Sequence, residues 1–94
     1  MNRTPIHSIL TAVAKSFGVS VRQMASPSRR NDIVLARACY SNLATSAGFT
    51  LDFTGHLISR SKQMVSIYQR NHEYYLSIPE YRRTYNVVRN DSAC

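Results

Sequence analysis

The chain has 94 residues, which is enough for one modest hydrophobic core and too few for a second independent domain. Hydrophobic residues make up 44% of it, with only 3 Gly and 3 Pro, and this composition excludes a disordered basic tail. Twelve Lys and Arg against five Asp and Glu give a net charge of +7. Such an excess predicts a polyanionic partner, usually nucleic acid or an acidic membrane.

The cysteines and the apolar runs indicate a cytoplasmic protein. Cys39 lies in an apolar helical pattern and Cys94 is the last residue, so we expect two unpaired thiols in a reducing compartment. No apolar run approaches the roughly 18 residues that span a membrane. The apolar stretch near the N-terminus is interrupted by Lys15 and no cleavage pattern follows it, so we expect no signal peptide and no membrane partner.

The chain begins with a predicted helix over residues 5–17. Thr4 is the expected N-cap and Pro5 the first helical residue, and apolar side chains then recur at helical spacing. Gly18 is the expected end, because glycine readily adopts the left-handed conformation that closes a helix.

A short turn, a loop and a long helix follow. Ser20 can cap a single helical turn, and the Ser-Pro-Ser stretch at 26–28 is the clearest loop signal in the chain. Apolar residues on one face then predict a helix over 30–47, which Gly48 ends.

The second half of the sequence predicts three helices. Thr50 caps the first, over 51–58, and Ser59 caps the second, over 60–75. A capping box at 77–80 begins the last helix, over 78–88. No alternating pattern suggests a strand. The sequence therefore predicts an all-α fold of five or six helices in one domain, residues 1–88, with a flexible tail at 89–94.

The stretch 50–68 is the main functional signal. It reads as a short helix, a tight turn and a second helix, the arrangement by which a helix-turn-helix presents side chains to a DNA major groove. Arginine can bind guanine through two hydrogen bonds, glutamine can bind adenine in the same way, and a helix N-terminus attracts phosphate. The expected contacts from this stretch are His56, Ser59, Arg60, Ser61, Lys62 and Gln63.

A second group of basic residues surrounds the 26–28 loop. Arg29 and Arg30 follow it directly, and Arg37 lies two helical turns after Arg30 on a similar face. We expect these side chains to hold backbone phosphates or to enter a minor groove.

Other chemistry has little support in the sequence. The three histidines have no metal-ligand spacing with the cysteines, and the five carboxylates form no acid–base pair. The tyrosines at 74, 75, 81 and 85 follow helical spacing, which favours core packing over base stacking. We therefore expect neither an enzyme nor a cofactor, a metal or a small-molecule substrate.

The order of these signals resembles the C-terminal DNA-binding domain, domain IV, of the bacterial chromosomal replication initiator DnaA, which contains a TrpR-like helix-turn-helix. The family pattern "vA..fgvs...l" is matched by Val13-Ala14-Lys15-Ser16-Phe17-Gly18-Val19-Ser20 with Met24. Its "R...iv.aR...yL" helix is matched by Arg30, Ile33, Val34, Ala36, Arg37, Tyr40 and Leu43. Its "sl..iG" is matched by Thr50-Leu51 and Gly55, so the likeness covers about residues 6–76.

The resemblance implies duplex DNA binding, with Arg30 in the minor groove. The family's base-reading motif, GRDHsTV, aligns with Ser59-Arg60-Ser61-Lys62-Gln63-Met64-Val65, which keeps only the arginine and the last valine. Ser61, Lys62 and Gln63 therefore stand where the family reads its DNA box, and the chain has no room for the family's ATPase module.

These observations predict a nucleoid-associated double-stranded DNA-binding domain, sequence-specific, with a role in replication initiation, its regulation or transcription. The alternative is a protein–protein interaction module that kept the fold and lost sequence-specific reading.

Overall fold

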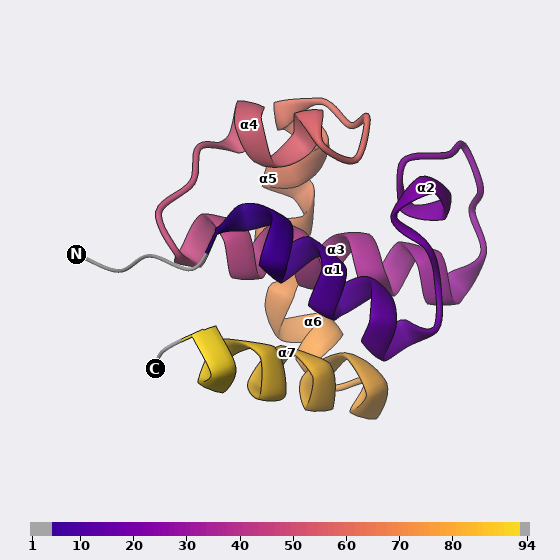
Figure 1. Cartoon of the computed structure of the whole chain (residues 1–94), viewed down its shortest axis with the longest axis vertical. Helices are drawn as coiled ribbons and strands as arrows, with labels where there is room; N and C mark the ends of the chain where they lie inside the picture. The colour runs from indigo at the N-terminus through magenta and orange to yellow at the C-terminus, as the bar shows by residue number, and fades with distance from the viewer. Residues whose placement is uncertain (1–4, 93–94) are drawn as a thin grey trace.

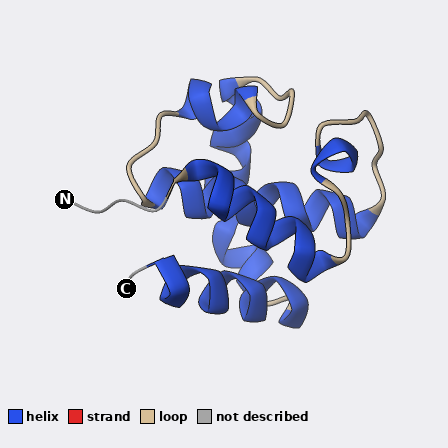
Figure 2. Ribbon diagram, in the orientation of Figure 1, coloured by secondary structure: helices blue, strands red, loops and turns tan. Residues whose placement is uncertain are grey.

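The structure is a computed structural model that describes residues 5–92. Across these residues it contains seven helices and no strand (Figure 2), so the predicted all-α class is confirmed, whereas the predicted number of five or six helices is too low. The helices are α1 (Ile6–Phe17), α2 (Val21–Met24), α3 (Asn31–Ser46), α4 (Leu51–His56), α5 (Lys62–Arg70), α6 (His72–Leu76) and α7 (Pro79–Ser92).

Helix α3 is the centre of the fold and contacts each of the other six helices. Figure 1 shows α1 alongside it, the α4–α5 pair at one end of the molecule and α7 at the other. Every residue from Leu35 to Ala44 is buried, so α3 is enclosed on all sides and not on the one face that the sequence pattern predicted. A helix surrounded in this way has no solvated face, and small residues such as Ala36 and Ala38 let its neighbours approach closely.

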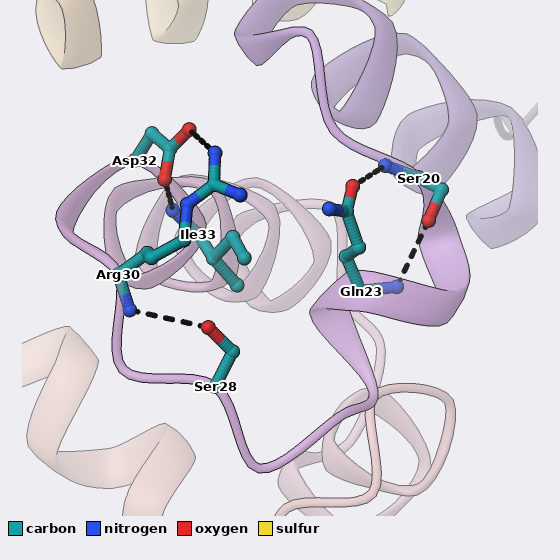
Figure 3. Close-up of polar contacts among 6 residues, drawn as sticks. All are labelled: Ser20, Gln23, Ser28, Arg30, Asp32 and Ile33. Carbon is teal, nitrogen blue, oxygen red and sulfur yellow. Dashed lines mark hydrogen bonds and ion pairs between the residues drawn. The ribbon is translucent and has the colours of Figure 1, made fainter.

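The local signals in the first half are largely confirmed. Pro5 is the N-cap residue of α1 and not its first helical residue as predicted. The predicted Thr4 cap lies outside the described residues. Gly18 closes α1 with φ 68°, and Val19 N–H donates to the Ala14 carbonyl at 3.0 Å. Ser20 and Gln23 form a reciprocal capping box with bonds of 2.8 and 3.0 Å (Figure 3).

The second half departs from the prediction in three places. Thr50 caps α4 as expected, accepting from Phe53 N–H at 3.1 Å, but the predicted helix over 60–75 is two helices that meet at Asn71. The capping box predicted at 77–80 makes the Ser77 hydroxyl an acceptor, whereas in the structure this hydroxyl donates to the Tyr74 carbonyl at 2.6 Å, at the end of α6. Helix α7 begins at Pro79 and continues to Ser92, past position 88 and into the segment expected to be a tail.

A polar network fixes α6 and α7 against α3. The Asn42 amide donates to the Tyr68 carbonyl at 3.1 Å and to the Tyr81 hydroxyl at 2.9 Å. The Tyr81 oxygen also lies 2.8 Å from His72 Nδ1. Tyr81 is fully buried and Tyr85 nearly so, which confirms core packing for these two tyrosines, whereas Tyr74 is 67% exposed.

Candidate nucleic-acid interface

Helices α4 and α5 pack directly on each other, and the turn between them wraps around Gly55. The Gly55 carbonyl accepts from Ile58 N–H at 3.0 Å and from Arg60 N–H at 2.9 Å. A Cβ atom at position 55 would overlap the Arg60 carbonyl oxygen and lie 3.1 Å from Val65 Cγ2. Only glycine therefore fits the turn as it stands.

The turn places the N-cap of α5 two residues later than the sequence predicted. Ser59 has φ 53°, a left-handed conformation, whereas an N-cap residue has an extended backbone. Ser61 has that backbone, with ψ 161°, and its hydroxyl accepts from Met64 N–H at 3.2 Å. The prediction that Ser59 caps this helix is wrong, and α5 begins at Lys62.

The N-cap and first residues of α5 are polar and exposed to solvent. Ser61, Lys62 and Gln63 are exposed, while Val65 and Tyr68 anchor the helix in the protein. His56, the last residue of α4, is exposed as well. The uncapped amides of a helix N-terminus and a cationic side chain are thus presented together, which suits an anionic ligand.

Arg60 does not point outward from α5 as predicted. It precedes the helix and is half-buried, and its Nη1 donates to the Ile58 carbonyl at 3.3 Å and the Ser59 carbonyl at 3.0 Å. Its Nη2 donates to the Ser26 carbonyl at 2.6 Å. Its donors therefore bind backbone of its own turn and of the 26–30 loop.

Arg37 is likewise turned inward and is only 3% exposed. Its Nε donates to the Met24 carbonyl at 2.7 Å, and its Nη2 donates to the Ser26 carbonyl at 2.6 Å and more weakly to Gln23 at 3.4 Å. Burial lowers the pKa of Arg37, and the nearby Arg60 charge lowers it further. The expected phosphate contact from an exposed Arg37 does not fit this burial, because α2 and the loop cover the side chain.

Arg29 and Arg30 are the exposed arginines of the loop. The Arg30 guanidinium folds back onto Asp32 at 2.8 Å (Figure 3), with its side chain still 62% exposed. The hydrogen bond from Arg30 lowers the pKa of the Asp32 carboxyl. Arg30 is therefore partly neutralised, and Arg29 has the freer charge of the two.

The loop and α5 face each other across an open groove of about 590 Å³. Pro27, Ser28 and Arg29 line one side, and Met64 and Tyr68 of α5 line the other. Arg37 and Arg60 also line it, and no carboxylate does so among the described residues. The groove places the loop beside the start of α5, a proximity that no sequence pattern revealed.

Residues 5–92 contain no helix that is both long and apolar enough to cross a bilayer. The same residues hold no group of three or more His, Cys, Asp and Glu suited to a metal ion. The fold and this surface define a compact all-helical protein with an exposed basic loop beside an exposed polar helix start. Comparison with protein-family models gives no match, and comparison with curated proteins gives none either.

Proposed function

We propose that the chain binds double-stranded DNA, with α4 and α5 as a helix-turn-helix and the start of α5 in the major groove. The observation that carries this proposal is the exposed first turn of α5, held away from the core by the tight Gly55 turn and flanked across one groove by the basic loop. The recognition helix of a helix-turn-helix exposes its N-terminal side chains to the DNA, while its opposite face packs on the protein.

The first turn of α5 carries chemistry for bases and for phosphate. Gln63 can bind adenine through two hydrogen bonds, and Lys62 can donate to guanine or to a phosphate oxygen. The Ser61 hydroxyl and the free amides of this turn suit the DNA backbone. Lys62 and Gln63 are therefore the proposed sequence-reading residues.

The loop supplies the second half of the proposed interface. Arg29, with its freer charge, is assigned to backbone phosphate, and Arg30 to phosphate or the minor groove after release from Asp32. Arg37 and Arg60 are not assigned a direct contact in this proposal, because they donate to carbonyl groups of the protein. His56 and Ser59 lie at the edge, where exposed side chains can reach phosphate.

The resemblance to the DnaA DNA-binding domain supports the same mode of docking. By analogy with that family, we propose that α5 and the arginine loop bind the same duplex, with a role in replication initiation, its regulation or transcription. Because Ser61, Lys62 and Gln63 replace the family's reading motif, we expect a different preferred DNA sequence.

Overall charge alone does not locate this interface, because Arg82, Arg83 and Arg89 on α7 are also exposed. Selection from a random duplex library tests the proposal. We expect an enriched motif that is lost in Lys62→Ala/Gln63→Ala and retained in Arg82→Gln/Arg83→Gln, the matched control on α7.

Amide chemical-shift mapping with the selected duplex should perturb residues 29–30 and 56–63. No enrichment, or perturbation confined to other surfaces, would contradict DNA reading by α5 and favour the protein-interaction alternative.

A further inference from the structure

The loop from Ser26 to Arg30 is shaped by its own serines. The Ser26 hydroxyl donates to the Gln23 carbonyl at 2.6 Å and accepts from Ser28 N–H at 3.3 Å. The Ser28 hydroxyl in turn accepts from Arg30 N–H at 3.3 Å (Figure 3). These bonds join residues at most three positions apart, so they define the bend of the loop and not its distance from α5.

The Ser26 carbonyl connects this loop to two distant arginines. The Ser26 carbonyl accepts from Arg60, which is 34 residues away in the sequence, and from Arg37, which is 11 residues away. Both bonds measure 2.6 Å and have a charged donor, which makes them the strong kind of hydrogen bond. The same Arg60 guanidinium holds the Ile58 and Ser59 carbonyls, so it joins the loop to the turn that precedes α5.

Stability alone does not readily explain this arrangement, because burying two guanidinium groups carries a desolvation cost. Arg37 is buried, Arg60 is half-buried, and the Arg60 charge disfavours the charged form of Arg37. Both guanidinium groups donate to backbone carbonyl oxygens, which carry no full negative charge. Taking a charged group out of water carries a desolvation penalty that its hydrogen bonds must offset, and the best-attested use of buried polar groups is to specify one arrangement.

We propose that Arg60 is a positioning residue, which together with Arg37 fixes the Ser26 carbonyl and so sets the loop at a defined place beside α5. Arg29 and Arg30 are thereby held, already in the free protein, where they can bind the same ligand as Lys62 and Gln63. The inference about DNA affinity rests on the proposed function, whereas the placement of the loop is a property of the free protein.

The free protein tests the placement. In Arg60→Gln we expect the Ser28 and Arg30 amides to exchange with solvent several-fold faster, with loop resonances broadened and α1 and α7 unchanged. Arg60→Lys is the second variant. It keeps the charge, but a single ammonium group cannot span the Ser26 and Ser59 carbonyls, so the same change is expected. Arg82→Gln removes an exposed arginine elsewhere and should change nothing in the loop. Unaltered exchange at Ser28 and Arg30 in both Arg60 variants would overturn the proposal.

A double-mutant cycle on the selected duplex separates positioning from direct contact. Arg60→Gln alone should weaken binding roughly tenfold, as a lost contact in such an interface does. In an Arg29→Gln/Arg30→Gln background the same substitution should weaken binding less than about twofold, because residues that act through each other are not additive. Equal losses in both backgrounds would show that Arg60 contacts DNA itself and overturn the positioning role. If the wild-type chain binds no duplex, the proposed function fails, and the exchange measurement still decides the loop placement.

Discussion

Arg37 and Arg60 each donate a 2.6 Å hydrogen bond from Nη2 to one acceptor, the carbonyl oxygen of Ser26. One arginine comes from the central helix α3 and the other from the turn before α5, so a single peptide group connects three parts of the fold. Both side chains looked like surface DNA contacts in the sequence. In the structure Arg37 is buried and Arg60 is half-buried, and the exposed residues around them include Arg29, Arg30 and the start of α5.

Arg37 should matter for stability. Arg37→Met removes the donor to the Met24 carbonyl and one of two donors to Ser26, in a place where water cannot readily replace them. We expect a loss of about 2 kcal/mol in the free energy of unfolding, measured by urea denaturation. Arg22→Met, on the exposed face of α2, is the control and should stay within about 0.5 kcal/mol of wild type. Equal midpoints for the two variants would show that the Arg37 bonds contribute nothing.

The position of the α5 cap gives a second prediction. Ser61→Ala removes the hydroxyl that accepts from Met64 N–H and should destabilise the protein by about 1 kcal/mol in thermal or urea unfolding. Ser59→Gly should be neutral or stabilising by up to about 1 kcal/mol, because glycine adopts the positive φ of this turn without strain. A loss of stability in Ser59→Gly, with no effect of Ser61→Ala, would restore Ser59 as the cap.

Gly55 should not tolerate a side chain. In Gly55→Ala the new methyl group meets the Arg60 carbonyl oxygen, which is backbone and cannot rotate away, so the turn must shift. We expect a loss of about 2 kcal/mol or more in unfolding free energy, even though alanine favours helices. Gln69→Ala, at an exposed position of α5, is the control that shows the ordinary effect of alanine in a helix. A Gly55→Ala protein as stable as this control would mean that the α4–α5 turn is looser than described.

His72 should make stability depend on pH. Burial lowers its pKa from 6.5, opposed in part by the charge of Glu73. Asn42 donates to the Tyr81 hydroxyl, so the Tyr81 proton is available for His72 Nδ1, which accepts it only in the neutral ring. The unfolded chain therefore binds a proton at higher pH than the folded chain does. The contribution is present above about pH 6.5 and is lost as pH falls through the unfolded and then the folded pKa.

Urea unfolding at several pH values measures this effect. His72→Asn, which places an amide oxygen near the former Nδ1 position and does not titrate, should flatten the decline in stability as pH falls below about 6.5. His56→Gln, at an exposed position, should leave the decline in place. A wild-type profile that is flat over this range, or unchanged in His72→Asn, would contradict a neutral His72 in the Tyr81 network.

If the chain binds duplex DNA as proposed, Lys62 should contribute to the salt dependence of that binding. If it neutralises a phosphate, Lys62→Gln weakens binding and reduces the magnitude of the slope of log affinity against log salt by about 1. Gln63→Ala, which removes no charge, should keep the slope and relax the base preference at one position of the site. An unchanged slope in Lys62→Gln would show that its ammonium does not contact phosphate. Affinities are compared by fluorescence anisotropy over a series of salt concentrations.

Local sequence signals correctly predicted the features that depend on neighbouring residues. The helical spacing of α1, the left-handed Gly18, the Ser20 capping box and the Thr50 cap all satisfy backbone groups within a few positions of the residue concerned. Such short-range interactions are readable because their partners are adjacent in the chain. The all-α class followed from the same periodicity.

The orientation of the candidate DNA-binding side chains depends on contacts between distant parts of the chain. The sequence gives no sign that Ser59 adopts a positive φ, that the predicted 60–75 helix breaks at Asn71, or that α3 is enclosed on every side. Arg37 and Arg60 both donate to the Ser26 carbonyl. This acceptor lies 11 and 34 residues away from them in the sequence, so no local pattern predicts the two hydrogen bonds. An arginine's direction is set by the acceptors within its reach, and folding alone brings those acceptors near.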